Sequence, residues 1–168
     1  WLAETLQNQL GNSWEREAKA LNEQAPTVLR TNTLKTSPQN LVSILADEGV
    51  KAFTLKNHPD AVQLEEKKNV FLTSAFKNGL FEVQDASSQT IAHLLSPKEG
   101  ERIIDACAGA GGKTLHISAL MKNKGQIIAL DIFDWKLAEL KRRAKRAGAH
   151  NIETRLISDN KVIKRLHN

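Results

Sequence analysis

The stretch DACAGAGGKT, residues 105–114, decides the fold class of this 168-residue chain. It contains three glycines, three alanines and the chain's only cysteine, Cys107. The run RIIDA (102–106) predicts a strand before it, and KTLHISALMKN (113–123) predicts a helix after it. A glycine-rich turn between a strand and a helix lets the backbone approach a ligand at the helix N-terminus. The stretch is therefore the first candidate for a binding site.

Residue spacing excludes two kinds of nucleotide-binding turn. A Walker phosphate loop needs a glycine five positions before its Gly-Lys pair, and Cys107 stands there. A dinucleotide fingerprint that begins with Gly109 and Gly111 needs a third glycine where Thr114 stands. The remaining pattern is a strand, an acidic residue, a turn of small residues and a helix. This pattern suits an adenosyl ligand that has no pyrophosphate.

The strand–helix order continues toward the C-terminus. Strands are predicted at 126–130 and 153–158, with a helix closed by Gly148 at 134–148 between them. Strands that alternate with single helices are typical of right-handed crossovers in a parallel sheet. The prediction is an α/β fold, the first half of a Rossmann-like parallel sheet, with a fourth strand expected only beyond Asn168.

Aspartates stand at the C-terminal ends of these three strands, where open α/β sheets bind ligands. Asp105 ends the first strand. Asp131 ends the second and could accept hydrogen bonds from both hydroxyls of a ribose, while Asp159 after the third could accept from an adenine amino group. Asp134 competes for the ribose role, but it stands at a predicted helix start. Aspartate is also common in turns, so a purely structural role stays open for each.

The N-terminal half predicts a separate small α+β unit. After two helical segments come a strand at 27–33 and a helix at 37–49, which begins with Ser-Pro and ends with glycine. The pair Asn78-Gly79 between apolar flanks predicts a β-hairpin. A new pattern begins near residue 84, so domains are expected at 1–83 and 84–168.

Composition limits the possible functions. A formal net charge of +5 and a pI near 9.4 favour a polyanionic partner such as nucleic acid. One cysteine cannot form an internal disulfide, and the five histidines show no metal-ligand spacing, so no metal site is expected. No apolar run approaches the roughly 18 residues that span a bilayer, so no membrane partner is expected either. These features fit a reducing, cytoplasmic setting.

Two segments together carry a family resemblance. GLFEVQDASSQ (79–89) followed by DACAGAGGKT resembles the Nop/Sun family of S-adenosylmethionine-dependent RNA cytosine-5 methyltransferases, and most closely its RsmB-type 16S ribosomal RNA members. VLRTNTLK (28–35) is similar to the start of that family's RNA-recognition-like subdomain. Many relatives have proline where Ala110 stands. The resemblance implies S-adenosyl-L-methionine as cofactor and structured RNA, above all ribosomal RNA, as partner.

The resemblance also implies roles for individual residues. Asp131 would hold the ribose hydroxyls, and Asp159 would contact the adenine. Gln84, Asp85 and Ser88 match a helix of the family that supports the site. The residues that would line the methionine and ribose side of the cofactor are Cys107, Ala108, Gly109, Ala110, Gly111, Gly112 and Lys113.

The chemistry of the family needs cysteines that this sequence does not hold. A thiolate adds to carbon 6 of cytosine, which makes carbon 5 nucleophilic enough to take the methyl group. The family's two functional cysteines lie in Pro-Cys and Thr-Cys pairs, and neither pair occurs here. Cys107 is expected to pack or to line the cofactor instead. No catalytic residue is therefore assigned, and the chain is expected to be an N-terminal, front-half fragment that is inactive by itself.

Other functions and partners stay open. The chain could be a non-catalytic RNA-binding module with a vestigial cofactor turn, or part of a methyltransferase for transfer RNA. Arg30 and Lys35 are candidate RNA contacts, whereas the basic run 136–150 is expected to be a solvated helix face. Without a fourth strand beside it, RIIDA would be an exposed apolar edge, which predicts self-association.

Overall fold

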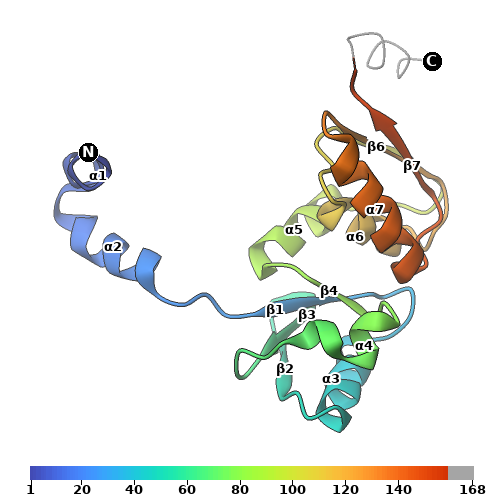
Figure 1. Cartoon of the computed structure of the whole chain (residues 1–168), viewed down its shortest axis with the longest axis horizontal. Coiled ribbons are helices and arrows are strands. Elements are labelled where there is room, and N and C mark those ends of the chain that lie inside the picture. The colour runs from blue at the N-terminus through green and yellow to red at the C-terminus, as the bar shows by residue number, and fades with distance from the viewer. Residues whose placement is uncertain (159–168) are drawn as a thin grey trace.

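Two β-sheets, each with its own helices, form the body of the molecule, and two N-terminal helices project from it (Figure 1). The computed structural model describes residues 1–158. The first sheet is antiparallel, with strand order β2-β3-β1-β4, and the second is parallel, with order β5-β6-β7. A small α+β unit followed by a Rossmann-like half-sheet confirms the predicted fold class.

The first sheet packs against one long helix and two short ones. Its strands are β1 (Val28–Thr31), β2 (Ala52–Leu55), β3 (His58–Leu64) and β4 (Phe81–Val83). The helices are α3 (Pro38–Asp47), the 3-10 helix η2 (Val70–Leu72) and α4 (Ser74–Lys77). Fully buried apolar side chains join strands and helices into one core, among them Leu29, Leu41, Leu45, Val62 and Phe81.

The start of α3 follows its local sequence. The side chain of Ser37 accepts a hydrogen bond from the backbone N–H of Asn40 at 3.2 Å, and Pro38 occupies the first helical position. A serine cap satisfies a backbone donor that the helix leaves free, and proline loses nothing there because that N–H has no helical partner. The predicted helix is confirmed.

The β-hairpin predicted at Asn78-Gly79 is wrong. Thr73 caps the short helix α4 by accepting from the N–H of Phe76 at 3.1 Å, and Gly79 follows the helix with φ of +68°. The chain then enters β4, which pairs with β1 rather than with the segment before it. A Cβ at Gly79 would lie 2.1 Å from the carbonyl oxygen of Arg146. Glycine is therefore required here because the backbones of the two units, each a sheet with its helices, approach closely, and not because the chain makes a hairpin turn.

The second sheet is the predicted parallel half-sheet. Its strands are β5 (Arg102–Asp105), β6 (Gln126–Asp131) and β7 (Ile152–Leu156), and its helices are α5 (Ala86–Leu95), α6 (Gly112–Leu120) and α7 (Asp134–Ala147). The central strand β6 is buried from Ile127 to Asp131. The turns that follow β5 and β6 lie at the same edge of the sheet, where ligands bind in such folds. The domain boundary after residue 83 stays a proposal.

Strand β5 lies at one edge of the parallel sheet. Among residues 1–158, no strand pairs with its free side, and Ile104 is 44% exposed. The neighbouring helix α5 also exposes apolar side chains, namely Ile91, Leu94 and Leu95. An exposed apolar edge favours pairing with another chain. Self-association through β5 remains a prediction.

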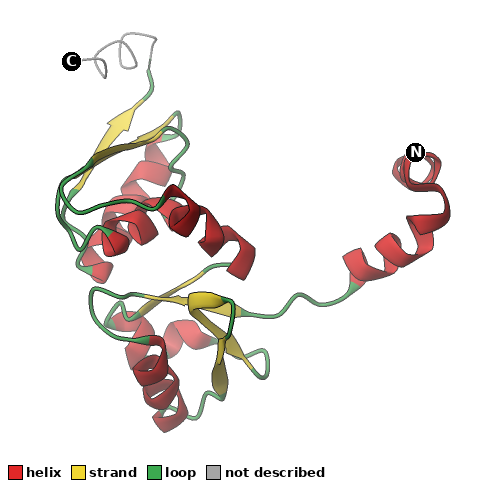
Figure 2. Ribbon diagram, turned by 180° about the vertical axis from the view of Figure 1, so that it is seen from behind, coloured by secondary structure: helices red, strands yellow, loops and turns green. Residues whose placement is uncertain are grey.

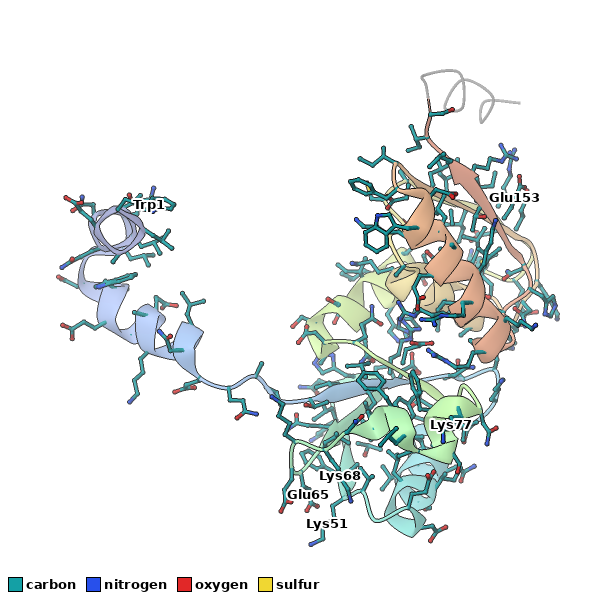
Figure 3. All side chains as sticks on the ribbon, in the orientation of Figure 1. Trp1, Lys51, Glu65, Lys68, Lys77 and Glu153 are labelled. Atoms are coloured by element: carbon teal, nitrogen blue, oxygen red, sulfur yellow. The ribbon has the colours of Figure 1, made fainter. Side chains whose placement is uncertain are left out.

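The N-terminal arm consists of α1 (Leu2–Leu10), the 3-10 helix η1 (Gly11–Ser13) and α2 (Trp14–Asn22). It extends away from both sheets (Figures 1 and 2), and none of its residues is buried. Its side chains surround the helices, and Trp1 is 91% exposed (Figure 3). Like the other helices of residues 1–158, α1 and α2 are not long and apolar enough to cross a membrane.

Candidate functional site

The turn between β5 and α6 folds back onto the end of β6. The N–H of Ala108 donates to the carbonyl of Leu130 at 2.8 Å, and the N–H of Gly111 donates to the carbonyl of Ala108 at 2.9 Å. Gly111 has φ of +87°, and a Cβ there would lie 2.6 Å from Cγ of Leu140 on α7. A side chain at this position would therefore push the turn off the helix packed behind it.

Asp131 fixes the turn from the end of β6. Its Oδ2 accepts from the N–H of Gly109 at 2.8 Å, and its Oδ1 accepts from the N–H of Phe133 at 2.9 Å. The Phe133 N–H is the main reason why the pKa of the Asp131 carboxyl lies below its ordinary value, and the Gly109 N–H adds to it. A carboxylate is thus held, in its charged form, against the glycine-rich turn.

Asp105 plays the corresponding part at the end of β5. Its Oδ2 accepts from the hydroxyl of Thr114 at 2.7 Å, and its Oδ1 accepts from the N–H of Cys107 at 3.3 Å. These contacts join the first residues of the turn to the first turn of α6. The role is structural, and it shapes the backbone that a ligand would meet.

The structure brings together all but one of the predicted cofactor residues. Asp159 lies outside the described residues, whereas Asp131 contacts the turn directly. Within the turn, exposure varies: Cys107 and Lys113 are exposed, Gly109, Ala110 and Gly112 are half-buried, and Ala108 and Gly111 are buried. The competing Asp134 is exposed at the start of α7, and its side chain makes no cap there.

Arg30 does not lie where the sequence prediction placed it. It is only 3% exposed, and its guanidinium donates to the carbonyl of Gly112 and to the side chain of Gln84. Burial lowers its pKa to about 10, which leaves it charged at neutral pH. The predicted RNA contact is wrong because this side chain is enclosed between β1 and the start of α6.

Asn32, which is buried, and Lys35, which stays exposed, also donate to the second unit. The ammonium of Lys35 donates to the carbonyls of Asn78 and Arg146 at 2.8 and 2.7 Å. The side-chain amide of Asn32 donates to the carbonyls of Gly79 and Ala147, each at 2.8 Å. The segment VLRTNTLK thus fastens the first sheet to the C-terminal end of α7. Lys35 is already occupied by two carbonyls, so the structure does not support it as an RNA contact.

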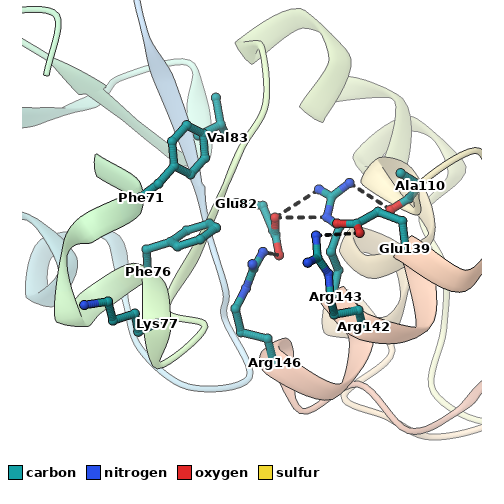
Figure 4. Close-up of a pocket in the computed structure, with 10 residues that line it drawn as sticks. All are labelled: Phe71, Phe76, Lys77, Glu82, Val83, Ala110, Glu139, Arg142, Arg143 and Arg146. Carbon is teal, nitrogen blue, oxygen red and sulfur yellow. Dashed lines mark hydrogen bonds and ion pairs between the residues drawn. The ribbon is translucent and has the colours of Figure 1, made fainter. Parts of the chain in front are cut away.

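A groove of about 770 Å³ opens between the two units. Figure 4 shows Phe71 and Phe76 on one wall and the arginines of α7 on the other. Glu82, which is 4% exposed, lies between the walls and pairs with Arg143 at 3.0 Å and with Arg146 at 2.6 Å. The basic run of α7 is therefore not only a solvated face, because two of its arginines turn toward the first sheet.

Two further contacts organise this groove. The guanidinium of Arg146 lies 3.9 Å from the ring centroid of Phe76. Arg143 also donates to the carbonyl of Ala110 at 2.8 Å, so one side chain contacts both Glu82 and the glycine-rich turn. The groove therefore ends at the same turn that Asp131 holds.

A cluster at another point of the interface joins three elements, with Asp60 and His116 buried and His93 half-buried, and sequence spacing gives no sign of it. Oδ2 of Asp60 on β3 lies 2.7 Å from Nε2 of His93 on α5 and 2.8 Å from Nε2 of His116 on α6. Two ligand atoms bound to one zinc ion would lie about 3.3 Å apart. The distances between Asp60 and the two histidines are shorter than that, and they are typical of hydrogen bonds. The cluster links the two units and leaves His116 Nδ1 without a partner among the described residues.

This cluster predicts that stability falls in mild acid. Burial works to raise the pKa of Asp60, but the hydrogen bonds and charges of His116 and His93 outweigh it and hold that pKa below its ordinary value. Burial is the main reason why the pKa of His116 lies below its ordinary value. The unfolded chain therefore takes up a proton at His116 before the folded chain does. The contribution of His116 to the free energy of unfolding is fully present above about pH 6.5. Below that pH it falls, with a slope of up to about 1.4 kcal/mol per pH unit.

Thermal unfolding between pH 8 and pH 5 measures this effect. The substitution His116→Gln keeps a donor for Asp60 but removes the titration, so its melting temperature should change less with pH than that of the wild type. His150→Gln, at an exposed histidine outside the cluster, is the control and should follow the wild type. An unchanged pH slope in His116→Gln would contradict the assignment.

Two family models match this chain. The model for the Methyltr_RsmF/B-like ferredoxin-like domain matches residues 1–71, and the model for the 16S rRNA methyltransferase RsmB/F matches residues 92–166. The first includes most of the antiparallel sheet. The second includes the glycine-rich turn and Asp131.

Curated relatives agree with these models. A ribosomal RNA small subunit methyltransferase B of Proteus mirabilis is 37% identical over 150 residues, which cover 89% of this chain and 35% of that protein. The protein of the same name from Escherichia coli is 37% identical over 148 residues, which cover 88% of this chain and 34% of the relative. The chain therefore spans about a third of the length of these relatives.

Solved structures share the fold over nearly the whole chain. PH0851 superposes with a TM-score of 0.88 at 30% identity, covering 97% of this chain and 38% of that one. A methyltransferase homologue from Pyrococcus horikoshii gives 0.83 at 33% identity, covering 94% and 52%. NSun6 from the same organism, solved with SFG, gives 0.89 at 21% identity, covering 97% and 66%, and this shows the shared fold alone.

Proposed function

Because the chain belongs to the Nop/Sun family of RsmB/F-type methyltransferases, we propose that it forms the S-adenosyl-L-methionine-binding half of an enzyme that methylates carbon 5 of a cytosine in ribosomal RNA. The observation that carries the proposal is the carboxylate of Asp131 bound to the glycine-rich turn. The working place of such an enzyme would be the cytoplasm.

The turn fits a nucleoside that carries an amino-acid tail. Each oxygen of Asp131 accepts one backbone N–H, which leaves further lone pairs for the two hydroxyls of a ribose. The Cβ position of Gly109 has no atom within 4 Å, so space remains beside the turn. Cys107 and Lys113, on either side of Gly109 in the sequence, are exposed. Asp159 completes the proposed set as the adenine contact.

In such an enzyme this chain would bind and orient the cofactor, which supplies the methyl group. Asp131 and the turn would hold the nucleoside, and Asp105 and Thr114 would keep the backbone in place behind it. Cys107 is the only cysteine of the chain, and it lies within the turn rather than across from it. It is therefore proposed to line the cofactor, and no thiol of this chain is assigned to carbon 6 of the base.

Calorimetry with S-adenosyl-L-methionine tests the proposal. Asp131→Ala should weaken binding at least about 30-fold, because it removes a charged acceptor for two hydroxyls and frees the N–H of Gly109. Asp131→Asn should lose less affinity for the cofactor, since its side chain keeps one acceptor oxygen. Asp134→Ala removes an exposed carboxylate only three residues away, and it should bind as the wild type does.

Two results would count against this assignment. Equal affinity in Asp131→Ala and wild type would remove Asp131 from the site, and a loss confined to Asp134→Ala would transfer the role to that residue. A wild-type chain that binds RNA but no cofactor would favour the RNA-binding module with a vestigial turn. Circular dichroism of each variant checks that the fold is kept.

A further inference from the structure

We infer that the groove between α4 and α7 binds a single-stranded stretch of RNA, with a base against Phe71 and a phosphate on Arg142. This inference rests on the proposed function, since it names the path of the substrate beside the cofactor turn. The groove is lined from the first unit by Phe71, Phe76 and Glu82, among others, and from the second by Arg142, Arg143 and Arg146 on α7.

The charge of the groove suits a polyanion. Four basic side chains and two acidic ones line it. The buried Glu82 pairs with both Arg143 and Arg146. One negative charge is thus shared by two positive charges, which leaves a net positive charge in the groove. The whole chain carries a formal charge of +5. A groove with excess guanidinium groups attracts phosphates and releases counterions when they bind.

Among the basic side chains that line the groove, Arg142 can most easily exchange its present ion pair for a phosphate. Its side chain is 76% exposed, and its ion pair is with Glu139, one turn earlier on the same helix. An exposed pair of this kind contributes little stability, so a phosphate can replace Glu139 at small cost. Arg143 and Arg146 are less exposed and are held by Glu82, so they shape the groove rather than reach out of it.

The aromatic wall gives the groove a second kind of recognition. Phe71 is 53% exposed and meets Phe76 edge-on, with ring centroids 5.0 Å apart. Phe76 in turn lies under Arg146, which fixes the position of the pair. A ring that stays half exposed in such a T-shaped contact offers surface to a base, and stacking of this kind accepts any base. A duplex keeps its bases stacked inside, so the ring favours a single strand.

The position of the groove relates it to the cofactor. Ala110 belongs to the glycine-rich turn and also lines the groove, where its carbonyl accepts from Arg143. RNA bound along α7 would therefore pass beside the turn that holds Asp131. An acidic protein would satisfy the arginines equally well, but the flat face of a base matches an exposed ring beside a phosphate-binding guanidinium. The combination of a guanidinium and a stacking ring favours nucleic acid.

Fluorescence anisotropy with a labelled oligouridine of about 12 nucleotides, at low salt, tests the inference. Phe71→Ala should weaken binding about tenfold through lost stacking. Arg142→Glu should weaken it at least about tenfold and lower the slope of log K against log salt by about one. The matched controls are Phe53→Ala, at an exposed ring on β2, and Lys145→Glu, at an exposed cation of α7 outside the groove. Both should stay within about twofold of the wild type.

The outcomes separate this inference from the proposed function. If the oligonucleotide binds equally to all variants, or to none including wild type, the groove assignment is overturned. If Arg142→Glu alone weakens binding, and polyglutamate competes as well as RNA does, the groove is a site for acidic protein and the inference also fails. Cofactor calorimetry on Phe71→Ala and Arg142→Glu should match wild type. Loss of RNA binding in these variants, from a chain that never binds cofactor, would support the groove while contradicting the proposed function.

Discussion

Gly79→Ala is expected to destabilise the chain by about 3 kcal/mol, because it forces two backbones apart. Its Cβ would lie 2.1 Å from the carbonyl oxygen of Arg146 and 2.7 Å from the carbonyl carbon. That carbonyl cannot move freely, since Lys35 donates to it and Asn32 holds the next one, of Ala147. The φ of +68° adds the penalty of a left-handed backbone for any residue with a side chain.

Urea unfolding of Gly79→Ala beside Gly100→Ala separates the two effects. Gly100 has φ of +88° with no atom within 4 Å of its Cβ position, so the control carries the backbone penalty alone. It should lose about 1 kcal/mol. If both variants lost the same free energy of unfolding, the contact with Arg146 would not be the reason why position 79 requires glycine.

Glu82→Ala is the second large effect, and we expect a loss of about 3 kcal/mol or more. The carboxylate is 4% exposed and pairs with both Arg143 and Arg146. Its removal leaves two partly buried guanidinium groups without their counter-charge, which is more damaging than the loss of a surface pair. The contact between the first sheet and α7 would weaken as a result.

Glu99→Ala is the matched control for this substitution. Glu99 also pairs with two cations, Lys122 and Lys124, but in solvent. Its loss should leave the unfolding midpoint in urea nearly unchanged. Glu82→Gln keeps the volume and one acceptor, and it should fall between the alanine variant and the wild type. A Glu82→Ala midpoint as little shifted as that of Glu99→Ala would contradict the role of burial.

The parallel half-sheet could be predicted because its signals are local. Each strand is a short apolar run, and α7 is closed by Gly148 in a left-handed conformation, which the sequence alone suggests. The turn could be distinguished from phosphate-binding loops by the spacing of Cys107 and Thr114 alone. The aspartate that ends β6 followed from the rule that ligands bind at the carboxyl ends of parallel strands.

The contacts between the two units could not be predicted in the same way. Arg30 reaches Gly112 across 82 positions, and Lys35 reaches Arg146 across 111. Sequence patterns report the period of an element and the residues beside it, so a basic residue on a predicted strand, such as Arg30, reads as a candidate RNA contact. The Asp60 cluster was missed for the same reason, since its members come from three elements and have no common spacing. Asn78-Gly79 resembles a hairpin turn because the partner of Gly79, Arg146, lies in another unit and leaves no local signal.

Through Arg143, the affinity for a cofactor at the turn is coupled to the relative orientation of the two units. One guanidinium bonds to Glu82 of the first sheet and to the carbonyl of Ala110 in the turn. Whatever orders the turn then also favours the present orientation of the two units, and by thermodynamic linkage each must strengthen the other by the same factor. A ligand that never touches the antiparallel sheet would still slow hydrogen exchange along β4.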